Sequence, residues 1–407
     1  MATNNYIKVL YNFFPVFIAF ILPFGNALSS PLIGLWLVSA LFSIKGNFVN
    51  GGWKSKEFLA LITFFILTCI SNFVFYNPND AFSAVEVKLS FLFFPVLFFL
   101  FKIELSIAKR IIGAFVSGCH FACWLCIAQA TYYLIQGDSS HFYYSNFSWF
   151  MHSAYFAMYL NLALLFVCIF YLAWFKSNLF YKRFSIYLIS LFSICIVLCA
   201  SKIGIAVLFT VVPVVLLVEF RKSIKFKHLA IIASIIFVTV FSIYQFVPQV
   251  FDRIKSVSVV SNTNIDKTST ESSSVRILIW EESVEIIKNN FLFGVGVSKA
   301  NETLYKAYEE HGLQGALEKK LNAHNQFFQT FIGIGVIGFL LLFLITVGVI
   351  YRGVRTKNII LAFFGVLVTV NFLVESMLQT SAGTVFYVFF FCFLLTFKIE
   401  DLKNEKA

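Results

Sequence analysis

Residues 326–350, QFFQTFIGIGVIGFLLLFLITVGVI, contain no charged side chain, and the run exceeds the roughly 20 residues that cross a bilayer as a helix. The apolar character is continuous rather than alternating, which favours a helix over a barrel strand. Every backbone polar group in a bilayer must be paired within the protein, and a helix achieves this within one segment. The stretch therefore predicts a membrane-spanning helix, in which Gly333, Gly335 and Gly338 are expected to let neighbouring helices approach closely.

Comparable apolar runs recur along the 407-residue chain, which is 59% hydrophobic and only 13% charged. A soluble domain is about a quarter charged. Twelve spans are predicted, near residues 6–24, 29–44, 58–76, 84–101, 110–135, 151–175, 184–200, 202–219, 228–247, 326–350, 358–375 and 381–397. The chain is expected to be an all-α polytopic membrane protein, with nine helices in 1–247, one large loop in 248–325, and three helices with a tail in 326–407.

The basic residues indicate which side each loop occupies. With the N-terminus in the cytoplasm, 20 of the 31 Lys and Arg residues fall in cytoplasmic segments, and the short opposite loops hold almost none. Both termini are therefore expected to be cytoplasmic and the large loop extracytoplasmic. The net charge of +11 reports this topology, and we do not expect a nucleic-acid partner. The eight cysteines all lie in apolar runs, where packing is the expected role rather than metal binding.

The large loop is Ser/Thr-rich at first and then regains a helical pattern. Ser274 is a predicted N-cap. It precedes an amphipathic helix whose expected apolar face is formed by Ile277, Trp280, Val284 and Ile287. Asn289 and Asn290 are expected to end this helix. A tight apolar turn follows at 291–297, and a second polar helix is predicted at about 299–321.

Several polar residues next to apolar spans on the loop side are candidates for chemistry. Lys202 is the one basic residue in its short outer turn. Arg276, at a helix start, suits an anion because free N–H groups and the guanidinium can both face it. His324 has the side chain most often used as a general base, and Asn325 is a candidate helix cap or substrate-positioning residue. Lys88 either snorkels, pairs with an acid or binds an anion.

Three further side chains are candidates for positioning a substrate: His152, His311 and Glu375. Glu375 either orients a hydroxyl or pairs with Lys88 or Lys202. The sequence has no GxxxxGK phosphate loop, Asp-x-Asp or HExxH motif. Because nucleotide donors are lacking outside the cytoplasm, an energy-rich donor there is expected to be lipid-linked.

Four ordered blocks resemble the O-antigen ligase family of bacterial membrane glycosyltransferases, which also includes O-antigen polymerases and protein O-oligosaccharyltransferases. The blocks are MHSAYFAMYLNLAL at 151–164, ASKIGIAV at 200–207, RILIWEESVEIIKNNFLFGVGVS at 276–298 and NAHNQFFQTFIGIGVIG at 322–338. The arginine common in the second block of the family is Lys202 here, so the charge is kept and the bidentate fork is lost.

The resemblance implies an inverting glycosyltransferase of the bacterial inner membrane that needs neither metal nor cofactor. The implied donor is a glycan on undecaprenyl diphosphate, and the implied acceptor is a hydroxyl of lipid A-core. If the chain is a polymerase, the acceptor is a second lipid-linked glycan. If it is an oligosaccharyltransferase, the acceptor is a protein. By resemblance, His324 is the base, and Arg276, Lys202 and Lys88 hold the diphosphate.

A membrane transporter is the alternative of a different class, because charges inside membranes also mark transport paths. Transporters often contain repeated halves. No such repeat is visible in the sequence, and the polar candidates cluster on one side. The enzyme is therefore the favoured hypothesis.

Overall fold

The computed structural model describes residues 2–25, 29–43, 47–74, 81–171, 179–214, 217, 267–268 and 273–403. The elements named within these ranges are helices, and one isolated bridge joins Phe48 to Phe101. In chain order they are α1 (Ala2–Ile21), η1 (Leu22–Phe24), α2 (Ser29–Phe42), η2 (Gly52–Lys54), α4 (Lys56–Val74), α5 (Ala81–Glu86), α6 (Ser90–Phe99), α7 (Leu105–Ile135), η3 (Ser139–Phe142), α8 (Tyr144–Phe147), α9 (Ser153–Phe166), η4 (Val167–Tyr171), α11 (Leu179–Leu198), α12 (Lys202–Ala206), η5 (Val207–Val211), α16 (Ser273–Asn289), α17 (Ala300–Glu310), α18 (Gln314–Glu318), α19 (Gln326–Arg355), α20 (Ile359–Phe372), η6 (Met377–Gln379), α21 (Ser381–Thr396) and α22 (Ile399–Lys403).

Seven helical segments within the described ranges are long and apolar enough to cross a membrane, and four apolar helices are shorter. The long segments are Tyr6–Phe24, Lys56–Val74, Phe82–Phe99, Leu105–Ile135, Ser153–Tyr171, Leu179–Leu198 and Gln326–Arg355, and the shorter ones are Ser29–Phe42, Lys202–Val214, Ile359–Phe372 and Ser381–Thr396. The all-α, multi-pass class is thereby confirmed. The predicted span at 228–247 lies outside the described residues, so the count of twelve stays a prediction.

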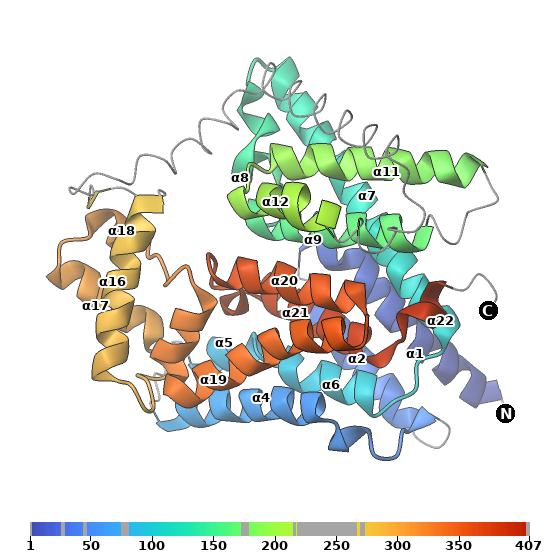
Figure 1. Cartoon of the computed structure of the whole chain (residues 1–407), viewed down its shortest axis with the longest axis horizontal. Coiled ribbons are helices and arrows are strands. Elements are labelled where there is room, and N and C mark those ends of the chain that lie inside the picture. Colours follow the sequence, from blue (N-terminus) through green and yellow to red (C-terminus); the bar gives the residue numbers. More distant parts are fainter. Residues whose placement is uncertain are drawn as a thin grey trace.

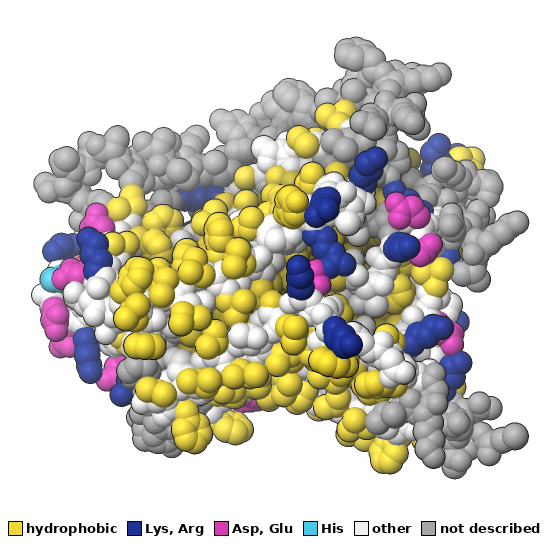
Figure 2. Space-filling model, turned by 60° about the horizontal axis from the view of Figure 1, so that its bottom comes forward, with side chains coloured by type: hydrophobic (Ala, Val, Ile, Leu, Met, Phe, Trp, Pro, Cys, Tyr) yellow, Lys and Arg dark blue, Asp and Glu magenta, His cyan; other side chains and the backbone are white. Residues whose placement is uncertain are grey.

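The molecule has a charged end, an apolar middle and a second charged end. Helices α16, α17 and α18 lie at one end, hereafter the loop end, and both termini lie at the other (Figure 1). Hydrophobic side chains cover much of the middle, whereas acidic and basic side chains gather towards the two ends (Figure 2). Exposed hydrophobic residues of the long apolar helices include Ile70 on α4 and Leu344 on α19. An apolar belt of this kind matches the hydrocarbon layer of a bilayer.

Helices α9 and α21 form the centre of the bundle. Every residue of α9 is buried. Tyr159 of α9 stacks on Phe386 of α21 with ring centroids 4.3 Å apart, and its hydroxyl donates to the carbonyl of Ala382 at 2.8 Å. Further along, Phe166 meets Phe390, so the two helices run in the same direction. Their N-terminal ends, which carry candidate site residues, therefore lie at the same end of the bundle.

The turn at 291–297 is inserted into a break in α19. Gly335 has φ 76° and ψ −166°, which interrupts the helix and releases carbonyls of the preceding turn. The carbonyl of Ile332 then accepts a hydrogen bond from the N–H of Val295 at 2.7 Å. A Cβ on Gly335 would lie 2.2 Å from the carbonyl oxygen of Leu292. The absence of a Cβ at Gly335 therefore lets the backbone of the turn at 291–297 approach the helix. The sequence had predicted a neighbouring helix as the partner at this glycine.

The second predicted helix of the loop is two helices. The predicted segment at about 299–321 divides into α17 and α18, because Gly312 has φ +69° and ends α17 with the left-handed residue that commonly stops a helix. Helix α16 begins at Ser273, so Ser274 lies inside its first turn rather than before it. Its end at Asn289 agrees with the prediction.

The buried face of α16 differs in part from the predicted apolar face. Val275, Ile279, Ser283 and Ile286 are buried, whereas Val284 is 37% exposed. The buried face includes a serine whose hydroxyl donates to the carbonyl of Ile279 at 2.7 Å and so needs no other partner. A pattern of apolar residues alone misses such a position. The face packs on α17, α18 and α19, and this positions Arg276 next to the start of α19.

Candidate functional site

The turn before α19 holds His324 in an unusual conformation. His324 has φ 44°, a left-handed value that is uncommon outside glycine. Asn325 caps the helix, because its Oδ1 accepts hydrogen bonds from the N–H groups of Phe327 at 2.9 Å and Phe328 at 3.1 Å. The capping role predicted for Asn325 is thus confirmed, and the cap fixes where the chain enters the helix.

Neighbouring side chains support this turn from three directions. Trp280 of α16 donates its indole N–H to the carbonyl of Ala323 at 3.0 Å. The N–H of Ala323 donates to Oε1 of Gln329 at 3.0 Å, and that of His324 to Oδ1 of Asn322 at 3.0 Å. A residue held in a sparsely populated conformation costs about 1–3 kcal/mol and persists only where its surroundings impose it. The turn therefore presents the imidazole in one fixed position.

His324, Arg276 and Glu375 meet in one cluster, hereafter the triad. Nδ1 of His324 lies 3.3 Å from Oε2 of Glu375, and Nη2 of Arg276 lies 2.7 Å from Oε1 of the same carboxylate. The side chains come from the turn before α19, from α16 and from the segment 373–380 between α20 and α21. Glu375 is buried, while the His324 and Arg276 side chains are 21% and 29% exposed. The base and the cation thus share a buried carboxylate and remain accessible themselves.

The charge of the triad fixes the role of each imidazole nitrogen. Burial raises the pKa of Glu375, but the hydrogen bond from His324 and the charges of His324, Arg276 and His152 outweigh it, so the pKa lies below its usual 4.5. An ionised carboxylate only accepts hydrogen bonds, so Nδ1 of His324 is the donor of the pair. In the neutral imidazole the opposite nitrogen, Nε2, is then the proton acceptor. This is the arrangement that a general base needs.

Glu375 therefore pairs with Arg276 and His324, whereas the sequence analysis considered Lys88 or Lys202 as its partner. The sequence could not choose among these cations, because nothing in it gives distances between residues so far apart along the chain. The pairing places a carboxylate behind the imidazole, and this carboxylate orients the ring.

His152 and Lys202 lie at the N-terminal ends of two helices that pack on each other, α9 and α12. His152 caps α9, with Nδ1 accepting from the N–H of Ala154 at 3.4 Å, and its charge reaches Glu375. Lys202 is the first residue of α12. Asn161 of α9 donates to the carbonyl of Gly204 in α12 at 3.1 Å, which fastens α12 to α9.

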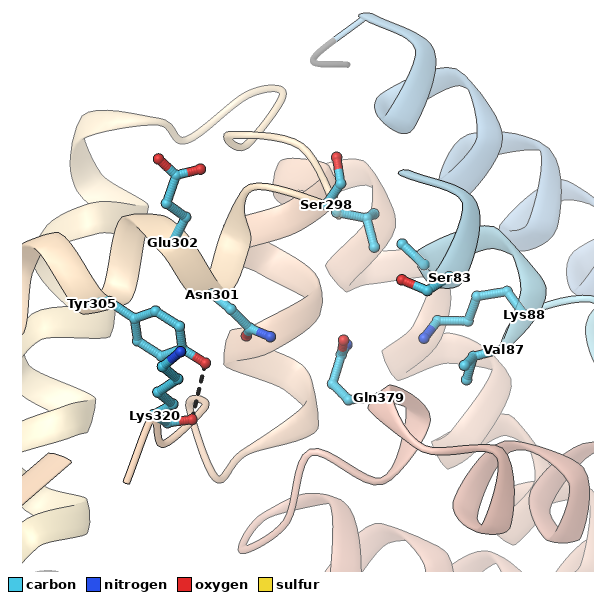
Figure 3. A pocket seen from close by; sticks show the side chains of 11 residues that line it. Ser83, Val87, Lys88, Ser298, Asn301, Glu302, Tyr305, Lys320 and Gln379 are labelled. Atoms are coloured by element: carbon cyan, nitrogen blue, oxygen red, sulfur yellow. Dashed lines mark hydrogen bonds between the residues drawn. The ribbon is translucent and has the colours of Figure 1, made fainter. Parts of the chain in front are cut away.

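Lys88 lies apart from the triad, in the wall of a cavity. It sits between α5 and α6, is 3% exposed, and donates from Nζ to the carbonyl of Leu378. The cavity has a volume of about 550 Å³ (Figure 3) and is lined by Ser83, Ala84, Val87, Lys88, Val297, Ser298, Asn301, Glu302, Tyr305, Lys320 and Gln379. None of the triad residues lines it. The segment 373–380 connects the two sites, because Glu375 belongs to the triad and Leu378 contacts Lys88.

His311 contacts a different carboxylate. Its Nδ1 lies 2.7 Å from Oε2 of Glu282, and this hydrogen bond raises the pKa of His311 above 6.5. Glu285 is close by, with the potential ligand atoms of the three residues within 4.8 Å of one another. The expected role of His311 in positioning a substrate remains a prediction, and its observed contact is between α17 and α16.

Two buried amides organise the site and were not among the candidates predicted from the sequence. Gln329 connects the N–H of Ala323 to Oδ1 of Asn301, and Oε1 of Gln326 accepts from the N–H of Leu378 at 2.7 Å. Both glutamines lie in the first turns of an apolar helix. Because a buried amide needs partners, two such residues in QFFQT were a usable signal.

Comparison with known families finds a match. A family model described as O-antigen ligase matches residues 186–343. The matched region includes Lys202, Arg276 and His324, while Lys88, His152 and Glu375 lie outside it. No curated protein matches the chain. The match confirms the family resemblance and covers the second, third and fourth sequence blocks, whereas the first block, at 151–164, lies outside it.

Proposed function

We propose that this chain, which belongs to the O-antigen ligase family, transfers a glycan from undecaprenyl diphosphate to an acceptor hydroxyl at the outer face of the bacterial inner membrane. The observation that carries the proposal is the triad, in which one buried carboxylate orients an imidazole and binds a guanidinium. Glycan transfer from a diphosphate needs these two functions: a base for the acceptor proton and a cation for the leaving group.

His324 acts as the base in this proposal. The acceptor hydroxyl oxygen forms a bond to the anomeric carbon while Nε2 of His324 takes the hydroxyl proton. The bond between that carbon and the diphosphate oxygen breaks, and its electron pair leaves with undecaprenyl diphosphate. Attack opposite the leaving group inverts the anomeric centre. Glu375 stabilises the imidazolium that forms, through the hydrogen bond to Nδ1.

Arg276 and Lys202 hold the diphosphate. The Arg276 guanidinium has five N–H donors, of which the bond to Glu375 uses one, and its side chain is partly exposed. It stands in the first turns of α16, where free backbone N–H groups also favour an anion. These side-chain cations supply the charge stabilisation, and we propose a reaction that needs no metal. Retained activity in a chelator would support this, and loss restored by a divalent ion would contradict it.

The proposed acceptor is lipid A-core, which makes the protein a ligase. In a deletion strain, accumulation of long lipid-linked chains supports the ligase reaction. Core carrying single glycan units in that strain would indicate a polymerase, and loss of glycoprotein a protein oligosaccharyltransferase.

The direct test is transfer by the purified protein from a defined lipid-linked glycan. His324→Asn is the variant of choice, because asparagine tolerates the left-handed φ better than most residues and so keeps the turn. We expect its kcat to fall by about 10²–10⁴-fold, the usual contribution of a general base. Equal transfer by His324→Asn and the unmodified protein, at equal expression, would refute the catalytic role.

A further inference from the structure

The cavity beside Lys88 has no role in the transfer step described above. It separates α17 from the α5 side of the bundle, and its volume of about 550 Å³ falls in the range of about 300–1,000 Å³ typical of ligand sites. It is exposed at Glu302 and Lys320 and ends at the buried Lys88. A chamber with an open mouth and a polar inner wall can receive a hydrophilic ligand from the aqueous side.

Polar groups from three separate segments point into the space (Figure 3). The Lys88 ammonium has three N–H donors, and the carbonyl of Leu378 accepts one. The amide of Gln379 also points into the space (Figure 3), and its side chain has no hydrogen bond within the described part of the chain. Lys88 is buried and keeps two N–H donors, and Gln379 is partly exposed, so both side chains can hydrogen-bond to a polar ligand in the cavity.

The orientation of the third group, Asn301, follows from its neighbours. The N–H of Ala323 can only donate, so the atom of Gln329 that it contacts is the oxygen, Oε1. The other end of that amide, Nε2, must then donate to Oδ1 of Asn301 at 2.9 Å. The Asn301 amide nitrogen therefore faces the cavity as a donor, as Figure 3 shows.

This lining suits an oxygen-rich ligand. Lys88, Asn301 and Gln379 offer N–H donors, and hydroxyl or carbonyl oxygens of a sugar can accept them. An apolar ligand would leave these donors without partners at about 1–3 kcal/mol each. The ring of Tyr305 is fixed by a hydrogen bond from its hydroxyl to the carbonyl of Lys320 at 2.9 Å. An aromatic ring beside polar side chains offers an apolar surface to the C–H groups of a sugar.

The cavity and the triad share structural supports. Gln329, which is 2% exposed, connects Asn301 in the cavity wall to Ala323, the residue before the proposed base. On the other wall, Leu378 contacts Lys88 and belongs to the segment that carries Glu375. A ligand in the cavity would therefore contact elements that also hold the reacting groups.

We infer that this cavity is a subsite for a sugar unit of the lipid-linked donor, recognised by Lys88, Asn301 and Gln379. The inference rests on the proposed function and deepens it. It assigns Lys88 to the glycan, whereas the family resemblance suggested the diphosphate. The subsite would orient the donor sugar before transfer and would contribute to selection among glycans.

The test compares two lipids binding to the purified protein in nanodiscs: undecaprenyl diphosphate, and undecaprenyl diphosphate carrying one N-acetylglucosamine. We expect the sugar to tighten binding at least tenfold. Asn301→Ala and Gln379→Ala should each reduce this gain to less than threefold, and Val87→Trp, which fills the cavity, should abolish it. The exposed Glu310→Gln on α17 is the matched control and should keep the full gain.

Two results would overturn the inference: equal affinity of the unmodified protein for both lipids, or an undiminished gain in Asn301→Ala and Gln379→Ala. The alanine variants suffice if Val87→Trp does not fold. Lipid binding can be measured without glycan transfer. A failure of the proposed subsite can therefore be distinguished from a failure of the proposed function. A gain that depends on the cavity without any glycan transfer would refute the proposed function alone. Transfer by a protein that binds both lipids equally would refute the subsite alone.

Discussion

Glu375 is the residue on which the proposed chemistry depends most, because its two oxygens serve two partners. It holds the Nδ1–H of His324, which leaves Nε2 as the proton acceptor, and it binds Arg276. Its pKa below 4.5 means that the carboxylate is ionised throughout the neutral range. A neutral amide in its place would neither favour the imidazolium nor balance the guanidinium.

We therefore predict that Glu375→Gln lowers kcat about 100-fold with a smaller change in KM, since an orienting carboxylate acts mainly on proton transfer. Steady-state transfer assays against Glu310→Gln, an exposed carboxyl-to-amide control, check this. A kcat equal to that of the control would show that Glu375 has only a structural role. Glu375→Asp should recover part of the activity, because it keeps the charge.

The residues of the triad could be chosen from the sequence, but their geometry could not. His324 and Arg276 were predicted by type and position, and Glu375 by its place at the end of a span. The left-handed turn at His324 depends on a hydrogen bond donated by Trp280 and on one accepted by Gln329, and these residues lie on another element or further along the chain. Such contacts cannot be predicted from the residues next to His324 in the sequence.

At the scale of elements, the interlock of α19 with the turn at 291–297 positions the triad. The turn at 291–297 follows α16, which carries Arg276, and the broken helix α19 follows His324. The contact between the turn and α19 therefore fixes the position of Arg276 relative to His324. The sequence predicted both elements but not the break, because one glycine among apolar residues is equally compatible with a continuous helix. The partner backbone that occupies the break comes from a separate segment.

We predict that Gly335→Ala destabilises the protein by at least about 2 kcal/mol, because alanine is strained at φ 76° and its Cβ would meet the carbonyl of Leu292 at 2.2 Å. Gly348→Ala is the control in the same helix, where an added Cβ meets nothing within 4 Å. It should be neutral or slightly stabilising. Thermal unfolding followed by size-exclusion chromatography distinguishes them, and equal midpoints would contradict the interlock.

The contact between α16 and α17 predicts a pH dependence. The pKa of His311 is raised above 6.5 by Glu282, so the pair stabilises the fold fully below about pH 6.5 and loses this contribution as pH rises through the raised pKa. The melting temperature of the unmodified protein should therefore exceed that of His311→Gln at pH 6. The difference should shrink by pH 9, and an unchanged difference would exclude the protonated pair as its cause.

At the scale of the whole molecule, the long helix α19 sets the polarity of the fold. Its 30 residues correspond to about 45 Å when fully helical, which exceeds the roughly 30 Å hydrocarbon core of a bilayer even with a kink. His324 precedes it at the loop end, and Arg352 and Arg355 occupy its last turn. Composition was sufficient to predict the all-α, multi-pass class, because the thickness of the bilayer constrains the length and apolar character of every span.

The positive-inside pattern then predicts that the loop end faces away from the cytoplasm, and single-cysteine labelling can test this. Glu310 on α17 and Thr356 after α19 are both exposed, and they lie at opposite ends of the molecule. In intact spheroplasts, a membrane-impermeant maleimide should label Glu310→Cys but not Thr356→Cys, and both should react after permeabilisation. Seven of the eight native cysteines are buried, so the unmodified chain gives a low background. Labelling of Thr356→Cys alone in intact spheroplasts would place the triad on the cytoplasmic side, where nucleotide donors exist and a lipid-linked donor is no longer required.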